Sequence, residues 1–287
     1  MLWNRSVRLV RAVLLGASVL IVPVLFLSVG TAQAGSLFSV DVLANRLVLI
    51  DTETGAVDEV GGLGVDVNDV NLALVGGSLL MLDKSTENPV LRTINPATGA
   101  VVSSVAIVTP GINTGVEGFA NDNGQLIVSF NDPNLTTVSP WVSRAMGEIS
   151  LAGVVSTLGV ISTSSEIDSI LVDASGDWYG LNVATAPGSK FYDINASGSG
   201  FTITQEQVYS GFTYLTQMTY SRDGELYGIT SGTKELLRFD TGSFAISSQT
   251  GYDSNYKLLG LAPIPEPSTA ILLGVGLAGL GMRRRRR

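Results

Sequence analysis

Three carboxylates and one amide occupy matching places in repeated segments of this 287-residue chain. Asp69, Glu117, Asp168 and Gln217 each stand at the start of a short apolar run, and their positions agree within about one residue when the segments are aligned. Grouped carboxylates can bind a hydrated divalent cation, accept hydrogen bonds from sugar hydroxyls, or act as acid and base in glycoside cleavage. The alternative is that they are ordinary solvated carboxylates near strand ends.

Composition removes several other kinds of chemistry. The chain has no Cys and no His, so it offers no thiol nucleophile, disulfide, Cys/His zinc site or imidazole base. Any catalysis would use carboxylates, hydroxyls, Lys or Arg. No cofactor is expected. Calcium is the alternative to the absence of a cofactor, because the turns NDNG, DASGD and SRDG resemble calcium-binding loops. These turns lack the twelve-residue spacing of an EF-hand. Asp and Asn in such turns usually bond their own backbone.

The elements that would position these residues form a repeat. Each repeat contains an apolar run that ends in a polar anchor residue, then a short turn and a second apolar run, as in LVLIDTETGAVDEV. The anchors are Asp51, Asn95, Ser150, Asn195 and Asp240. Their spacings of 44, 55, 45 and 45 residues match a β-propeller blade of four antiparallel strands, and an insertion at 130–144 explains the longer spacing.

A second hairpin pattern lies halfway between the anchors. Its turns are rich in Gly, Asp or Asn, and glycine is favoured there because it adopts positive φ without a steric penalty. The turn glycines are Gly77, Gly124, Gly176 and Gly224. The alternation in residues 226–229 favours a strand with one face in a core between blades.

The two ends of the repeat region complement each other. The first copy lacks its opening strand, and the last copy has an extra one at Leu258–Ala262. If this strand joins the blade begun by Ser36–Val42, the ring closes and leaves no exposed sheet edge. The sequence therefore predicts an all-β fold, with a single five-bladed β-propeller over residues 35–263. A pair of β-sandwiches or an open β-solenoid are the alternatives, although neither needs one terminus to complete the other.

Charge is distributed unevenly along the chain. Of the 17 basic residues, three lie in 1–34 and five in 264–287, whereas Glu266 is the one acid of those two segments. The middle therefore carries nine basic and 24 acidic residues, a net charge of −15. Such a body repels phosphate backbones, so nucleic acid is not an expected partner. The acidity could attract cations or basic partners, or simply keep an extracellular domain in solution.

The N-terminal segment has the pattern of a secretory signal. Arg5, Arg8 and Arg11 precede an apolar run, and Ala32 and Ala34 supply the small residues of a signal-peptidase site. Residues 1–34 are therefore predicted to be a signal peptide, exported through the Sec system and cut after Ala34. An uncleaved anchor is the alternative, because the run is long enough to span a membrane.

The C-terminal segment, residues 264–287, has three parts. A hinge with Pro265, Glu266 and Pro267 leads into fifteen apolar or small residues, Ser268 to Met282. The chain then ends in Arg283, Arg284, Arg285, Arg286 and Arg287. Fifteen helical residues span about 22 Å against roughly 30 Å of hydrocarbon, so a short transmembrane helix is predicted, with the arginines in the cytoplasm. A tail anchor with stop-transfer arginines is the plain alternative.

Hinge, glycine-rich apolar helix and arginine cluster, in this order, resemble the PEP-CTERM sorting signal. That signal occurs in exported proteins of Gram-negative bacteria, often producers of exopolysaccharide or biofilm. The resemblance implies that exosortase, a membrane-embedded cysteine protease, recognises and processes the tail. It also implies transient anchoring in the inner membrane, followed by release to the outer cell surface or extracellular matrix. It covers residues 264–287 and does not identify the exported cargo.

Two functions remain for the body. The first is a non-enzymatic binding or structural propeller of the cell envelope or matrix, with exopolysaccharide or an envelope protein as partner. The second is a hydrolase or lyase that acts on extracellular polysaccharide with carboxylates at the channel mouth, since two carboxylates suffice for that reaction. The first is favoured, because no local acid motif supports the second.

Overall fold

The structure is a computed structural model, and its contacts divide the chain into two units, Met1–Gln33 and Ala34–Arg287. The residues it describes all lie in the second unit: 35–86, 88–109, 115–130, 145–161, 167–183, 188–197, 200–211 and 214–265. The predicted signal peptide with Ala32 and Ala34, the insertion after residue 130, and the sorting segment from Glu266 onward therefore lie outside the described residues. Within the described part, no helix is long and apolar enough to span a membrane.

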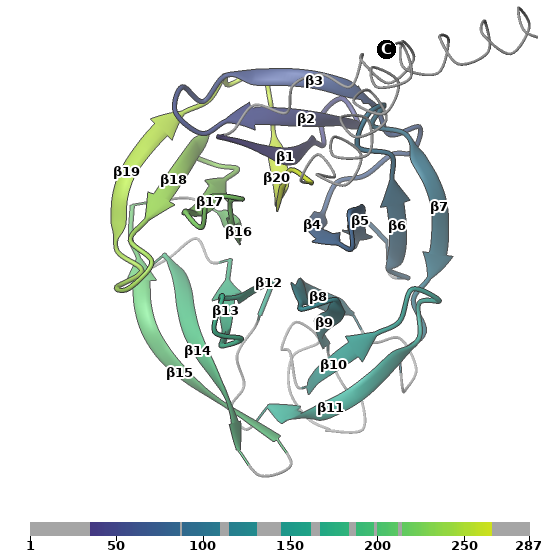
Figure 1. The fold of residues 1–287 in the computed structure, drawn as a ribbon, viewed down its shortest axis with the longest axis vertical. Helices are drawn as coiled ribbons and strands as arrows, with labels where there is room; N and C mark the ends of the chain where they lie inside the picture. The colour runs from purple at the N-terminus through teal and green to yellow at the C-terminus, as the bar shows by residue number, and fades with distance from the viewer. Residues whose placement is uncertain are drawn as a thin grey trace, which may run out of the picture. The chain divides into compact units, whose positions relative to one another are not determined.

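Every regular element of the described part is a β-strand, which confirms the predicted all-β class. Sheets of antiparallel strands are arranged around a centre, with β4, β8, β12, β16 and β20 innermost and β3, β7, β11, β15 and β19 outermost (Figure 1). Each innermost strand contacts the next, from β4 to β8, β12, β16 and β20, and β20 contacts β4. The arrangement is β-propeller-like.

One sheet combines the two ends of the body, in the order β20-β1-β2-β3. Its strands are β20 (Leu258–Pro263), β1 (Ser36–Asp41), β2 (Arg46–Asp51) and β3 (Val57–Gly62). β1 and β20 are antiparallel, with Leu37 opposite Pro263 and Asp41 opposite Leu258. The Ser39 hydroxyl donates to the Gly260 carbonyl oxygen at 2.8 Å, which fixes the register where the pairing shifts.

Two further sheets follow the chain order from centre to periphery. The first comprises β4 (Val70–Val75), β5 (Ser78–Asp83), β6 (Val90–Ile94) and β7 (Val101–Ala106). The second comprises β16 (Leu215–Tyr220), β17 (Leu226–Thr230), β18 (Glu235–Phe239) and β19 (Ile246–Gly251). In both, consecutive strands pair antiparallel through short turns, as the repeat pattern predicts.

The remaining strands form one eight-stranded sheet, in which two sets of four join at their outer strands. One set is β8 (Val116–Asp122), β9 (Gln125–Phe130), β10 (Ala145–Ile149) and β11 (Val155–Ile161). The other is β12 (Ser169–Val172), β13 (Trp178–Asn182), β14 (Ser189–Ser197) and β15 (Gly200–Tyr209). The join is a short parallel pairing of β11 with β15, at Val160–Gly200 and Ile161–Phe201.

Clusters of buried apolar side chains fill the spaces between neighbouring sheets. One cluster packs Leu37 and Leu258 of the first sheet against Tyr227 and Ile229 of β17. Another cluster packs Leu226 of β17 against side chains of β12–β15. The prediction that residues 226–229 have one core face is therefore wrong: all residues of β17 are buried, because an inner strand lies between two cores.

The hairpin turns have the predicted backbone conformation. Gly77, Gly124, Gly176 and Gly224 all have positive φ, between 79° and 96°. Trp178 links the two halves of the eight-stranded sheet: its indole donates to Asp122 of β8 at 2.9 Å, and its ring stacks on Phe201 of β15 with centroids 5.5 Å apart.

Candidate functional site

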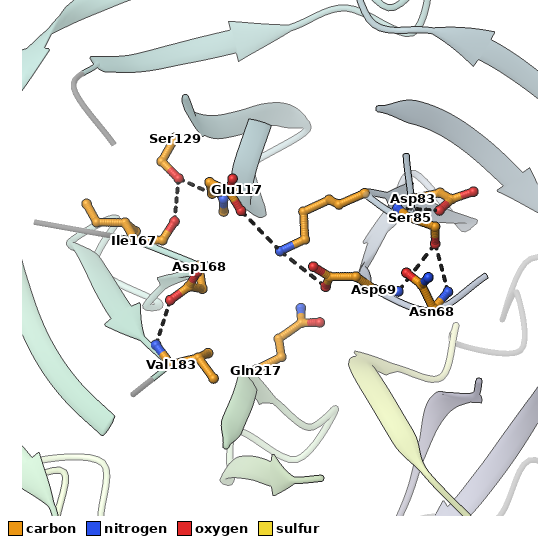
Figure 2. Close-up of polar contacts among 12 residues, drawn as sticks. Asn68, Asp69, Asp83, Ser85, Glu117, Ser129, Ile167, Asp168, Val183 and Gln217 are labelled. Atoms are coloured by element: carbon orange, nitrogen blue, oxygen red, sulfur yellow. Dashed lines mark hydrogen bonds and ion pairs between the residues drawn. The ribbon is translucent and has the colours of Figure 1, made fainter. Parts of the chain in front are cut away.

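The four candidate residues lie at corresponding ends of four inner strands. Asp69 and Asp168 directly precede β4 and β12, whereas Glu117 is the second residue of β8 and Gln217 is the third residue of β16. Figure 2 shows their side chains around one central space. The register thus varies by a few residues between strands, because β8 and β16 have irregular pairing at their starts.

A lysine that sequence reasoning missed lies among the carboxylates. The ammonium nitrogen Nζ of Lys84 is 3.4 Å from Oδ1 of Asp69 and 3.7 Å from Oε2 of Glu117. The Lys84 side chain is 8% exposed, whereas the Asp69 side chain is 54% exposed and that of Glu117 is 20% exposed. The ammonium is therefore buried beneath an acidic mouth.

The charge state of Lys84 follows from two opposed effects. Burial alone would lower the pKa of the ammonium, because a charged group loses hydration. The nearby carboxylates of Asp69, Glu117 and Asp168 outweigh this effect and raise the pKa above its usual value. Lys84 is therefore protonated at neutral pH and acts as a fixed cation, not as a base or nucleophile.

A signal in the sequence could have located Lys84. It follows Asp83 at the end of β5, and the β4–β5 hairpin places it beside Asp69, whose carbonyl oxygen accepts from the Lys84 amide at 2.8 Å. A lysine at an inner hairpin end, opposite an acid, indicates an internal ion pair. The acids lie at one strand of each hairpin, whereas Lys84 follows the partner strand β5, so the repeat pattern of the acids does not include it.

Asp168 is held by the backbone of its own hairpin. Its Oδ2 accepts from the Val183 amide at 2.6 Å (Figure 2), and its amide donates to the Leu181 carbonyl oxygen. The Ser129 hydroxyl donates to the Ile167 carbonyl oxygen and accepts from the Gly118 amide, both at 2.7 Å. This serine therefore fixes the positions of Glu117 and Asp168 relative to each other.

Gln217 has a different place from the three acids. Its side chain is buried, and Oε1 accepts from the amides of Leu72 at 3.0 Å and Leu261 at 2.9 Å. Its Nε2 donates to the Leu72 carbonyl oxygen at 2.7 Å. Gln217 therefore links β16 to both β4 and β20, and these backbone bonds occupy its polar atoms.

The turns that resemble calcium loops use their side chains locally, as predicted. Asn121 Oδ1 accepts from the Gly124 amide at 2.8 Å. Asp173 Oδ1 accepts from the amides of Ser175 at 2.8 Å and Asp177 at 2.9 Å. Among the described residues, no group of three or more acidic side chains is arranged to hold a metal ion.

A small cavity of about 160 Å³ lies along the inner strands. Leu72, Phe119, Ile170 and Met218 give it apolar walls, and Gln217 lies at its lining. A cavity of this size is below the range usual for drug-sized ligands.

Geometry and topology define a β-propeller-like body with a mixed-charge mouth. Residues 263–286 match the PEP-CTERM protein-sorting motif. The chain is therefore an exported protein sorted through exosortase to the cell surface, as the resemblance of its tail implies. No curated protein matches the chain.

Several solved structures are similar to the body at low sequence identity. Virginiamycin B lyase of Staphylococcus aureus is 14% identical, with a TM-score of 0.44, covering 81% of this chain and 76% of the lyase. A gluconolactonase of Xanthomonas campestris is 8% identical, with a TM-score of 0.49 and coverage of 78% and 74%. The Dos1 propeller is 14% identical, with a TM-score of 0.38 and coverage of 76% and 56%. Likeness at this level carries no information about activity.

Proposed function

We propose that the exported body is a non-catalytic binding and structural protein of the cell envelope or extracellular matrix, and that it contacts exopolysaccharide through the channel mouth. The observation that carries this proposal is the ion-pair cluster of Lys84 with Asp69 and Glu117. Lys84 is buried and holds Asp69 and Glu117 in place, while these two carboxylates keep exposed surface from which they can accept hydrogen bonds from sugar hydroxyls. Because three acids surround one cation, neutral or amino sugars suit it better than acidic ones.

The same cluster makes glycoside cleavage the weaker function. Cleavage needs one carboxyl group that is protonated and a second that is ionised. Asp69 and Glu117 are both engaged in ion pairs with Lys84, and a reaction at either carboxylate would have to break its pair. A carboxylate-dependent hydrolase or lyase is the alternative function, supported by the approach of three acids to one space (Figure 2).

We infer further that the body is a single five-bladed propeller closed by strands from both ends. Support comes from the order β20-β1-β2-β3 and from the sequence of contacts between inner strands, which returns from β20 to β4. The eight-stranded sheet then comprises two blades that touch at β11 and β15. Before processing, the sorting tail would hold this body at the inner membrane.

Binding to the host's own exopolysaccharide tests the function. The processed, secreted protein is titrated calorimetrically with that polysaccharide, alongside Asp69→Asn/Glu117→Gln/Asp168→Asn. We expect wild-type binding and at least tenfold weaker binding by the triple variant. Glu225→Gln is the control, since Glu225 lies on an exposed turn and pairs with Arg238.

Two results would contradict the proposal. Equal affinity of the wild type and the triple variant would remove the mouth from the binding surface. Release of new reducing ends by the wild type, lost in the triple variant, would establish the hydrolase instead.

A further inference from the structure

The joint between the folded body and the sorting motif has no spacer. The motif match begins at residue 263, and Pro263 is also the last residue of β20. Ile264 packs partly buried against the core between the first two sheets. The residues that a sorting protease must reach therefore start where the fold ends.

Several contacts hold β20 within the body. Leu258, Leu261 and Ala262 are fully buried. The Leu261 amide donates to Gln217, and the Ser39 hydroxyl donates to the Gly260 carbonyl oxygen. To bind in a protease cleft, the residues of β20 would have to leave two neighbouring sheets as well as β1.

The prolines of the joint lie on the side of β20 that faces away from β1. In the β1–β20 ladder Leu37 lies opposite Pro263, so an extension would place Gly35 opposite Pro265. Residues two apart in a strand direct their N–H groups to the same side. Pro263, Pro265 and Pro267 have this spacing, and proline has no N–H to donate. Because the Leu261 amide donates to Gln217 and not to β1, the nitrogens of Pro263 and Pro265 lie on that same side, so their missing N–H groups remove no donor from the β1–β20 ladder.

We propose that this joint sets the upstream limit of exosortase cleavage, so that the bond that is cut lies on the C-terminal side of Pro265. The folded body then contributes to the choice of bond together with the motif. Hydrolysis there consumes one water, leaves a carboxylate on the body and releases an amine on the tail. The proposal rests on sorting by exosortase and is independent of any glycan bound at the mouth.

The first test is the mass of the processed protein from an exosortase-bearing host. We expect every mature C-terminus at residue 265 or beyond. A C-terminus at residue 264 or earlier in the wild type overturns the proposal. Because this readout needs no ligand, its failure is distinct from a failure to bind exopolysaccharide.

The second test measures access to β20 directly with trypsin and the full-length chain from a host without exosortase. Lys257 is the useful site, because its carbonyl oxygen accepts from the Val42 amide at 3.0 Å and its amide donates to Asp41. In the wild type we expect cleavage among Arg283–Arg287 at least tenfold faster than after Lys257. Equal rates at the two places overturn the proposal.

Variants separate local opening from general unfolding. Gln217→Ala should speed cleavage after Lys257 at least tenfold and should add C-termini upstream of 265 in the exosortase host. Gln249→Ala, on the exposed strand β19, is the matched control and should behave as wild type. If Gln217→Ala is also cut rapidly after the buried Lys84, the body of this variant has unfolded. Ser39→Ala is then used instead, and its cleavage after Lys257 should be several-fold faster than in the wild type. Unchanged cleavage after Lys257 in the folded variants contradicts the proposal.

Discussion

Two joins between distant parts of the chain differ sharply in how they are held. β1 and β20 are separated by more than 200 residues, yet their pairing is supported by fully buried leucines and by the Ser39 and Gln217 side chains. β11 and β15 are closer in sequence, but they join through one short parallel pairing at the periphery, where Val160 is 40% exposed. Proximity along the chain is thus a poor guide to the strength of a join.

The difference follows from where each join lies. The β1–β20 pairing is at the inner side of its sheet, so its side chains face cores on both sides. The β11–β15 pairing lies at the outer edge, where side chains remain partly in water. Burial of apolar area, and not the number of paired residues, decides the stability of each join.

Truncation of one side chain in each join should give the largest contrast. Leu261→Ala removes a fully buried side chain of β20 and should lower the free energy of unfolding by about 2–4 kcal/mol. Val160→Ala, in the outer join, should lower it by less than about 0.5 kcal/mol. Urea unfolding of both variants measures the contrast, and equal losses would contradict the ranking of the joins.

A glycine contact tests the packing of the β2–β3 turn against the end of β19. Gly55, in the β2–β3 turn, has φ of 71°, and an added Cβ would overlap the Gly251 carbonyl oxygen at the end of β19. Gly55→Ala should therefore cost about 2–3 kcal/mol, from left-handed backbone strain and from separation of the two sheets. Gly124→Ala carries similar positive φ in open space and should cost only about 1 kcal/mol. Equal shifts in thermal denaturation would show that the turn contact contributes nothing.

Much of the fold could be predicted from local pattern. The turn glycines, the anchor residues and the complementary ends are all visible in short stretches, because turn geometry and strand alternation act over a few residues. The twofold burial of inner strands such as β17 could not be predicted in the same way. It depends on a second core contributed by a sheet elsewhere in the chain.

The site was predictable to a lesser degree than the fold. Alignment placed the three acids around one space, as Figure 2 shows, but it treated Gln217 as their equivalent. Gln217 instead bonds the backbone of β4 and β20, a role that only the three-dimensional neighbourhood reveals. Lys84 was missed because its partners Asp69 and Glu117 lie on different hairpins, and only one of these includes Lys84.

The smallest expected effect tests how much the ion pairs of Lys84 add to the free energy of unfolding, beyond the contribution of the β1–β20 pairing. Lys84→Met leaves Asp69 and Glu117 without their counter-ion and should cost about 1–2 kcal/mol at neutral pH, since both acids are partly hydrated. Because the folded-state pKa of Lys84 is raised above the unfolded value of 10.5, this stabilisation is complete below about pH 10 and is lost as the pH rises through the folded pKa. Urea unfolding from pH 7 to 11 measures it, with Lys190→Met on β14 as the control. A difference between Lys84→Met and wild type that stays constant up to about pH 10 and declines above it agrees with the raised pKa, whereas one that disappears below pH 9 contradicts it.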